Sequence, residues 1–189
     1  MSCLSILIAD DEALIRLDLK EMLQGAGHVV CGEASTGLQA IELAKSMTPD
    51  LAILDVMMPG LDGLDTAMAL HSMNIPVLLL TAYSQPKFIK RAEKVSVYGY
   101  LVKPIAEHTL LPAVQIAYAR WREMQDVRLK LQNTQHELQS QKLIARARAI
   151  LSAREGVNVY EAHQLLIREA MNQRISVVKL AAKIVNEGL

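Results

Sequence analysis

Residues 51–63 read Leu51-Ala52-Ile53-Leu54-Asp55-Val56-Met57-Met58-Pro59-Gly60-Leu61-Asp62-Gly63, and no other segment indicates the fold as clearly. The first four residues are all apolar, and an aspartate follows them directly. A short, continuously apolar segment is typical of a strand in a parallel sheet that helices cover on both faces. The Pro-Gly pair predicts a loop. We therefore expect a buried strand over residues 51–54 with Asp55 at its carboxyl end.

Similar segments flank this strand on both sides. Apolar composition predicts further strands over residues 4–9, 29–33, 77–80 and 98–102. Helical apolar spacing predicts helices over residues 14–25, 38–46, 64–72 and 87–94, and a fifth that begins near Thr109, which would cap it and leave Pro112 in the first turn. Five βα repeats predict an open, doubly wound α/β sheet with right-handed crossovers. Such sheets bind ligands at the carboxyl ends of their strands.

Polar residues stand at the predicted strand ends. Asp10 and Asp11 follow the first strand, Asp55 the third, Thr81 the fourth and Lys103 the fifth. Three carboxylates that lie together repel one another unless a hard cation such as Mg²⁺ binds them through oxygen. A carboxylate can act as a nucleophile toward phosphorus. The lysine can neutralise phosphoryl oxygens and the threonine can hydrogen-bond one of them. The pattern therefore predicts phosphoryl transfer.

Four motifs carry a specific resemblance. They are Ala9-Asp10-Asp11-Glu12, Leu54-Asp55-Val56-Met57-Met58-Pro59-Gly60-Leu61-Asp62-Gly63, Leu80-Thr81-Ala82 and Gly99-Tyr100-Leu101-Val102-Lys103-Pro104. Through them residues 1–118 resemble the receiver domain of bacterial response regulators. The resemblance implies a flavodoxin-like five-stranded parallel sheet in the order 2-1-3-4-5, and a sensor histidine kinase as partner.

The same resemblance implies a role for each site residue. Asp55 would be the phosphoacceptor. Mg²⁺ would be bound by Asp10, Asp11, Asp55 and the backbone carbonyl of Met57. Thr81 and Lys103 would sense the phosphoryl group, Tyr100 would be the aromatic switch, and Pro104 would follow a cis peptide bond.

Residues 119–141 differ from the preceding segments in composition and in the spacing of their apolar residues. No Gly or Pro occurs from Trp121 to Leu151, and apolar residues recur at heptad spacing at Met124, Val127, Leu131 and Leu138. This spacing predicts a long helix that pairs with a second copy as a coiled coil. Gln141 occupies a core position of the seam, so we expect weak pairing, which phosphorylation can regulate.

Residues 142–189 are expected to form a small three-helix bundle. Gly156 would end the long helix, and Asn158 would cap the next helix with Glu161 completing a capping box. Ser176 would cap a last helix that ends at Gly188. Met171 is expected in the apolar core.

The C-terminal portion of the chain, from about Leu129 to Leu189, resembles the ANTAR domain of antitermination regulators. The resemblance is carried by Lys142-Leu143-Ile144-Ala145-Arg146-Ala147-Arg148-Ala149-Ile150-Leu151, by residues 160–171 and by residues 178–185. It implies binding of paired RNA stem-loops in nascent transcripts. Arginine side chains can hydrogen-bond phosphates and stack on unstacked bases. The candidate RNA-binding residues are Arg146, Arg148, Arg168, Arg174, Lys179 and Lys183, with Tyr160 as an aromatic that could stack.

The distribution of charge, the apolar segments and the cysteines indicate which class of protein this is. The net charge is zero, but thirteen acidic and eight basic residues lie up to Pro112, against seven acidic and twelve basic residues beyond it. A basic second half points to nucleic acid. No segment predicts a signal peptide or membrane span. Cys3 and Cys31 have no metal-ligand spacing and are expected to be buried thiols in a reducing cytoplasm.

The sequence therefore favours a cytoplasmic response regulator, not a metabolic enzyme, that dimerises on phosphorylation and acts as an RNA-binding antiterminator. Two alternatives stay open. One is a phosphorylation-controlled DNA-binding transcription factor, which needs a recognition helix with base-reading polar residues. The other is a coiled-coil protein-interaction module without nucleic-acid binding.

Overall fold

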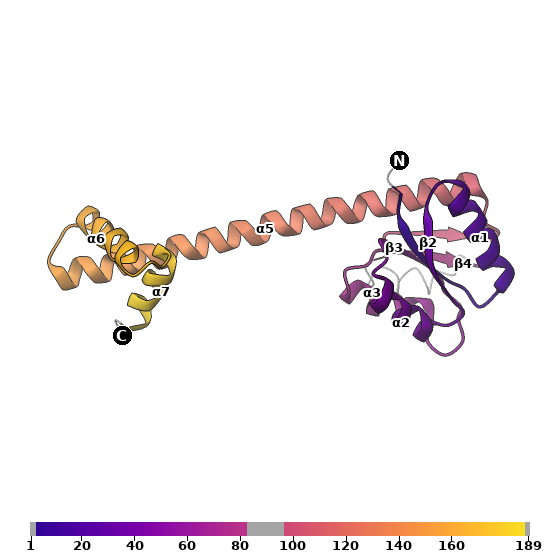
Figure 1. The fold of residues 1–189 in the computed structure, drawn as a ribbon, viewed down its shortest axis with the longest axis horizontal. Helices are drawn as coiled ribbons and strands as arrows, with labels where there is room; N and C mark the ends of the chain where they lie inside the picture. Colours follow the sequence, from indigo (N-terminus) through magenta and orange to yellow (C-terminus); the bar gives the residue numbers. More distant parts are fainter. Residues whose placement is uncertain (1–2, 83–96, 188–189) are drawn as a thin grey trace. The chain divides into compact units, whose positions relative to one another are not determined.

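The computed structural model describes residues 3–82 and 97–187 of the chain. The helix expected over residues 87–94 lies outside the described residues. The chain divides into two compact units, Met1–Gln125 and Asp126–Leu189. The elements are β1 Ser5–Ala9, α1 Ala13–Gly25, β2 Val29–Ala34, α2 Gly37–Met47, β3 Leu51–Asp55, α3 Gly63–Ser72, β4 Val77–Thr81, β5 Gly99–Val102, α5 Glu107–Glu155, α6 Val159–Asn172 and α7 Val177–Glu187 (Figure 1).

The first unit contains a five-stranded parallel sheet in the order β2-β1-β3-β4-β5, which confirms the expected flavodoxin-like topology. In the strand register, Ala9 pairs with Leu54, Asp55 with Leu80 and Thr81 with Val102. All strands run in the same direction, so their last residues share one edge of the sheet. This edge collects the side chains that follow β1, β3, β4 and β5.

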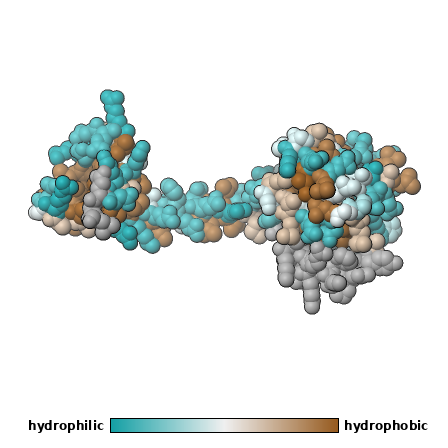
Figure 2. Space-filling model, turned by 90° about the horizontal axis from the view of Figure 1, so that it is seen from below, coloured by the Kyte–Doolittle hydropathy of each residue, from teal (hydrophilic) through white to brown (hydrophobic). Residues whose placement is uncertain are grey.

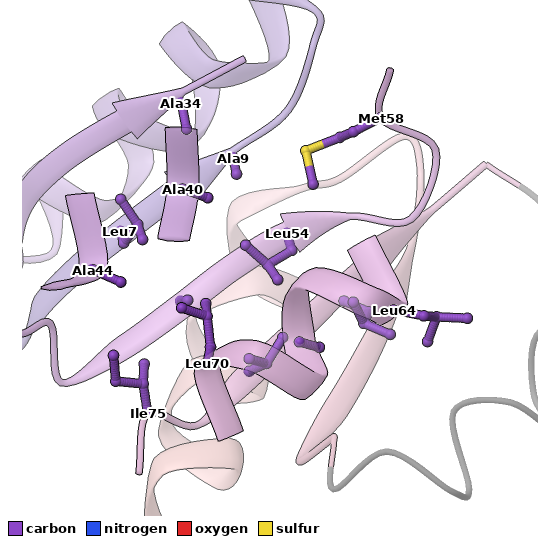
Figure 3. Packing of buried hydrophobic residues seen from close by; sticks show 14 of the residues in the cluster. Leu7, Ala9, Ala34, Ala40, Ala44, Leu54, Met58, Leu64, Leu70 and Ile75 are labelled. Carbon is purple, nitrogen blue, oxygen red and sulfur yellow. The ribbon is translucent and has the colours of Figure 1, made fainter. Parts of the chain in front are cut away.

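Two apolar layers explain why the strands are continuously apolar. Leu7 and Leu54 pack on one face of the sheet against residues of α2 and α3 (Figure 3). Ile8 and Ile53 point to the other face, against α1 and the first turns of α5. Successive strand residues alternate between faces, so both faces need apolar side chains when helices cover both.

Helix α5 begins earlier than expected. It starts at Glu107, and the carbonyl oxygen of Ala106 accepts hydrogen bonds from the backbone N–H and the hydroxyl of Thr109. The expectation that Thr109 caps this helix is therefore wrong, and Pro112 lies inside the helix beyond its first turn. The helix then continues without a break to Glu155, as the absence of Gly and Pro predicts.

The second unit is helical. The end of α5 packs with α6 and α7 around Ala147, Leu166, Ala170, Leu180 and Ala181. Gly156 follows the end of α5 with a φ of +68°, a conformation that favours glycine. Asn158 and Glu161 form the expected capping box, and the Ser176 hydroxyl accepts from Lys179 N at 3.2 Å. The predicted stop at Gly188 lies outside the described residues.

Three smaller observations complete the fold. Met171 is 73% exposed, so its placement in the core was wrong. Cys3 is exposed and Cys31 is half-buried, so neither is the buried thiol that we expected. Nowhere in the described part of the chain does a helix combine the length and the apolar character that crossing a bilayer requires.

Candidate functional site

Three carboxylates gather at the carboxyl edge of the sheet. Asp10 and Asp11 follow β1, and Asp55 is the last residue of β3. Each offers an oxygen, and these three oxygens lie within 4.8 Å of one another. Asp10 and Asp55 are buried, whereas Asp11 is exposed. The cluster exists because β1 and β3 are adjacent parallel strands that end together.

Lys103 is the cation of this cluster. It follows β5, and its backbone N–H donates to the carbonyl oxygen of Thr81 at 2.8 Å. The lysine Nζ lies 2.8 Å from Oδ2 of Asp10 and 3.3 Å from Oδ1 of Asp55. Oε1 of Glu12 lies farther away, at 3.6 Å. The Lys103 side chain is only 12% exposed, so its charge acts on the two buried carboxylates with little screening by water.

The cluster changes the acidity of two of its members. Burial raises the pKa of Asp55 and the neighbouring Asp10 charge raises it further, while the ion pair with Lys103 and the Met57 N–H offset only part of the increase. Burial alone would lower the pKa of Lys103, but its hydrogen bond to Asp10 and the charges of Asp55 and Asp10 together raise it. The site thus stabilises the lysine cation and opposes the second buried negative charge.

Backbone hydrogen bonds hold the carboxylates in place. Asp10 N donates to the Ala34 carbonyl at 3.1 Å, and Oδ1 of Asp10 accepts from Glu12 N at 3.0 Å. Oδ2 of Asp55 accepts from Met57 N at 3.2 Å. Arg16, on α1, donates through Nη1 to the carbonyl oxygen of Asp10 at 2.6 Å. Sequence reasoning missed Arg16, because its acceptors are backbone carbonyl oxygens and no sequence motif marks such a contact.

The other residues expected at this edge differ in how far they are exposed to solvent. Thr81 is half-buried at the end of β4. Tyr100 is 62% exposed on β5, and the Met57 side chain is 63% exposed in the loop after β3. The Lys103–Pro104 peptide bond is cis.

The donor set fits a hard divalent cation. All three clustered groups are carboxylates, and Mg²⁺ binds through a few carboxylates while it keeps several waters. The exposed Asp11 leaves one side of the cluster open to water. In the part of the chain that the structure describes, no other group of three or more acidic, histidine or cysteine residues lies close enough to share a cation.

The basic residues expected to bind RNA all lie in the second unit. They are Arg146 and Arg148 on α5, Arg168 on α6, Arg174 in the α6–α7 turn, and Lys179 and Lys183 on α7. Lys179 and Lys183 are four residues apart and share one face of α7. Arg146 and Arg148 are two apart and face different directions. Arg148 is half-buried, and its Nε is buried without a hydrogen-bond partner among the described residues. Tyr160 is 73% exposed.

The expected dimer seam is exposed on α5. Met124, Val127, Leu131 and Leu138 each have more than half of their surface accessible. In Figure 2 hydrophobic side chains are interspersed among hydrophilic ones along this helix. Exposed apolar residues at heptad spacing are typical of a helix that can pair.

Two protein families match the chain. Residues 6–115 match the response regulator receiver domain, and residues 132–185 match the ANTAR domain. The receiver match lies within residues 1–118. The ANTAR match lies within residues 129–189 and begins ten residues before residue 142, so it includes the end of the segment expected as a linker.

Individual relatives agree with the family matches. The transcriptional regulatory protein PdtaR of Mycobacterium tuberculosis is 40% identical over 185 residues, which cover 97% of this chain and 90% of that protein. The chemotaxis protein CheY of Thermotoga maritima is 31% identical over 58% of this chain and 92% of its own length. The solved structure of the signal receiver domain of NarL from M. tuberculosis is 33% identical in sequence, with a TM-score of 0.59, over 63% of this chain and 98% of that domain. The chain therefore belongs to the response regulators, with an N-terminal receiver domain and a C-terminal ANTAR domain.

Proposed function

We propose that a sensor histidine kinase phosphorylates this signalling regulator on Asp55 with Mg²⁺ bound, and that the phosphorylated chain acts as a transcription antiterminator. The functional parts are a receiver over residues 1–118, a coiled-coil linker over residues 119–141 and an RNA-binding part over residues 142–189. Phosphorylation favours a homodimer that presents two RNA-binding parts together, and two linked sites gain affinity through effective concentration.

The observation that carries the proposal is the cluster of Asp10, Asp11 and Asp55 around Lys103. A carboxylate oxygen of Asp55 attacks the phosphorus of the kinase's phosphohistidine. The phosphorus–nitrogen bond breaks, and the histidine leaves with the bonding electron pair on its ring nitrogen. Lys103 neutralises phosphoryl oxygen charge, and the Thr81 hydroxyl donates to one of those oxygens. Asp10, Asp11, Asp55 and the Met57 carbonyl would hold Mg²⁺. When bound there, the cation would neutralise charge on these carboxylates and on the phosphoryl group.

Intact-mass measurement after incubation with acetyl phosphate and Mg²⁺ tests the receiver. The wild-type chain is expected to gain one phosphoryl group, and peptide mapping should place it on Asp55. Asp55→Asn is expected to gain none. Asp50→Asn is the matched control, because Asp50 is only partly buried, lies at the opposite end of β3 and accepts a hydrogen bond from Ser5 N. A wild-type chain that gains no phosphoryl group contradicts the proposal.

The RNA-binding part of the proposal is supported by the match to the ANTAR domain and by the basic residues of the second unit. The relative PdtaR is named as a transcriptional regulatory protein. Hairpin loops present phosphates and unstacked bases that arginine and an exposed aromatic can contact. We therefore expect phosphorylated protein to bind terminator-leader hairpins better than a promoter duplex of equal length.

Gel shifts at several salt concentrations separate this proposal from its alternatives. RNA binding through phosphates should weaken steeply as salt increases. Stronger binding to the promoter duplex would favour a DNA-binding factor. Binding to neither nucleic acid, together with salt-resistant association with a protein partner, would favour the interaction module.

A further inference from the structure

The β1–α1 loop supplies two of the three clustered carboxylates, and one side chain holds its backbone. Nη1 of Arg16 donates to the carbonyl oxygen of Asp10 at 2.6 Å and lies 3.3 Å from that of Asp11. Arg16 belongs to the first turn of α1, where its backbone N–H donates to the Glu12 carbonyl at 3.2 Å. Arg16 is half-buried, and its side chain ties the loop to the first turn of α1.

We propose that Arg16 is a positioning residue of the cation site: it holds the Asp10 and Asp11 backbones so that their carboxylates converge with Asp55. This inference rests on the proposed function, because it assumes that the cluster binds a divalent cation. Among the described residues, Arg16 donates hydrogen bonds to the backbone oxygens of Asp10 and Asp11 and not to their carboxylates. It therefore acts through the backbone of these two residues.

The loop depends on Arg16 because Asp10 has several other hydrogen-bond and ion-pair partners, whereas Asp11 has fewer. Asp10 is also held by Ala34, Glu12 and Lys103. Asp11 is exposed, and the bond from Arg16 to its carbonyl is the one hydrogen bond that the described residues provide for it. The N-cap residue of α1, Glu12, makes no side-chain capping bond that would fix the loop instead. Loss of Arg16 should therefore release Asp11 most.

The charge of Arg16 predicts the opposite effect from its hydrogen bonds. A cation beside the cluster repels Mg²⁺, so an arginine that acted only through charge would weaken Mg²⁺ binding, and its removal would strengthen it. A positioning residue, in contrast, strengthens binding, and its removal weakens it. The sign of the change in Mg²⁺ affinity thus distinguishes the two roles.

The experiment compares Arg16→Met, Arg16→Lys and the control Lys20→Met in the full chain. Lys20 is also a cation on α1, but it pairs with Glu33 at 2.7 Å and not with the loop. Titration with MgCl₂ alone at constant ionic strength, followed by ¹⁵N NMR, gives the dissociation constant. Loss of residues that orient metal ligands commonly weakens metal binding by about 10–100-fold, so we expect roughly a tenfold increase in the dissociation constant for Arg16→Met.

Lys20→Met should bind Mg²⁺ as well as the wild type or slightly better. Arg16→Lys should be intermediate, because lysine keeps the charge but lacks the planar fork of donors. A second readout is the Mg²⁺ dependence of phosphorylation by acetyl phosphate. The half-saturating Mg²⁺ concentration should increase in Arg16→Met, while the rate at saturating Mg²⁺ stays close to that of the wild type.

Mg²⁺ binding by Arg16→Met that equals or exceeds wild-type binding overturns the inference and leaves the proposed function intact. A wild-type chain that binds no Mg²⁺ overturns the proposed function and this inference with it. If Arg16→Met does not fold, Arg16→Lys decides alone: weaker binding supports the inference, and unchanged or tighter binding overturns it. A lower rate at saturating Mg²⁺ with an unchanged dissociation constant also overturns it.

Discussion

Gly63, the first residue of α3, packs directly against the backbone of Asp55: a methyl group on its Cα would overlap the Asp55 carbonyl oxygen. Gly63 N also donates to the Val56 carbonyl oxygen at 3.0 Å. The start of α3 therefore lies against the end of β3, and the two ends of the loop that joins them are in contact. This contact restrains the Asp55 backbone, in addition to the pairing of β3 with its neighbours.

Gly63→Ala is expected to lower the free energy of unfolding by about 1–3 kcal/mol, the usual cost of overpacking a dense interior. It should also reduce phosphorylation by acetyl phosphate, because the end of β3 must shift. Chemical denaturation and intact-mass measurement check both effects. Gly25→Ala is the matched control, since a Cβ there meets nothing within 4 Å. Equal stability of the two variants would contradict the contact.

Asp55→Asn is expected to stabilise the chain against unfolding at pH 7 in the absence of divalent cations. Burial and the Asp10 charge raise the pKa of Asp55 in the folded state above its ordinary value of 3.8, although Lys103 opposes them. An acid whose pKa is raised by folding loses stability when it ionises. The penalty is fully present above the folded-state pKa and disappears below 3.8.

Thermal unfolding in EDTA from pH 7 to pH 3 measures this difference, which should shrink as the pH falls. Asp18→Asn, at an exposed position on α1, controls for loss of charge and should change little. Added Mg²⁺ should stabilise the wild type more than Asp55→Asn, because a ligand stabilises the state that binds it. A wild type that is more stable than Asp55→Asn in EDTA at pH 7 would contradict the role of burial.

Lys103→Met is expected to destabilise the metal-free chain by about 3 kcal/mol, because it leaves the buried carboxylates of Asp10 and Asp55 without a cation. The folded state raises the pKa of Lys103, so its contribution is fully present below 10.5 and is lost as the pH rises through the folded-state value. Denaturation of both single variants and of Lys103→Met combined with Asp55→Asn checks this. The double variant should lose less stability than the sum of the two single effects.

The sheet and the acidic cluster could be predicted from the sequence for one physical reason. Parallel strands that are buried on both faces are continuously apolar, and their ends share one edge, so Asp10, Asp55 and Lys103 had to converge once the strands were found. The start of α5 could not be predicted in the same way. Thr109 is a good N-cap residue in isolation, but the Ala106 carbonyl begins the hydrogen-bonded turns earlier.

Arg16 and Met171 show a second limit. The acceptors of Arg16 are backbone carbonyls, which every residue has, so no pairing of side chains in the sequence reveals them. Met171 is an apolar residue at the end of a short helix. Whether such a residue enters the core depends on where the next helix packs, and here α7 covers Ala170 instead.

Asn158→Ala is expected to destabilise the second unit by about 1 kcal/mol, the usual cost of losing an N-cap side chain. Oδ1 of Asn158 accepts from Tyr160 N at 3.0 Å and from Glu161 N at 2.9 Å. Amide hydrogen exchange should show faster opening of α6. Glu161→Gln is the control, because glutamine fills the same position of a capping box. Similar exchange in Asn158→Ala and the wild type would show that the cap contributes little.

Leu131→Glu is expected to prevent self-association of the phosphorylated chain. Leu131 is 57% exposed at a seam position of α5, and burial of a leucine contributes about 1.5–3 kcal/mol. Sedimentation equilibrium should therefore show at least a roughly tenfold increase in the dimer dissociation constant. Phosphorylation of Asp55 should be unchanged, because the receiver site is not altered.

Leu129→Glu is the matched control for the seam. Leu129 is 56% exposed on the same helix, but a residue two positions away points to nearly the opposite side of a helix. If any exposed leucine on α5 promoted association, both variants would weaken it equally. If association uses the heptad seam, only Leu131→Glu should weaken it. Equal self-association of unphosphorylated and phosphorylated wild type would leave the seam possible but would remove its regulation by Asp55.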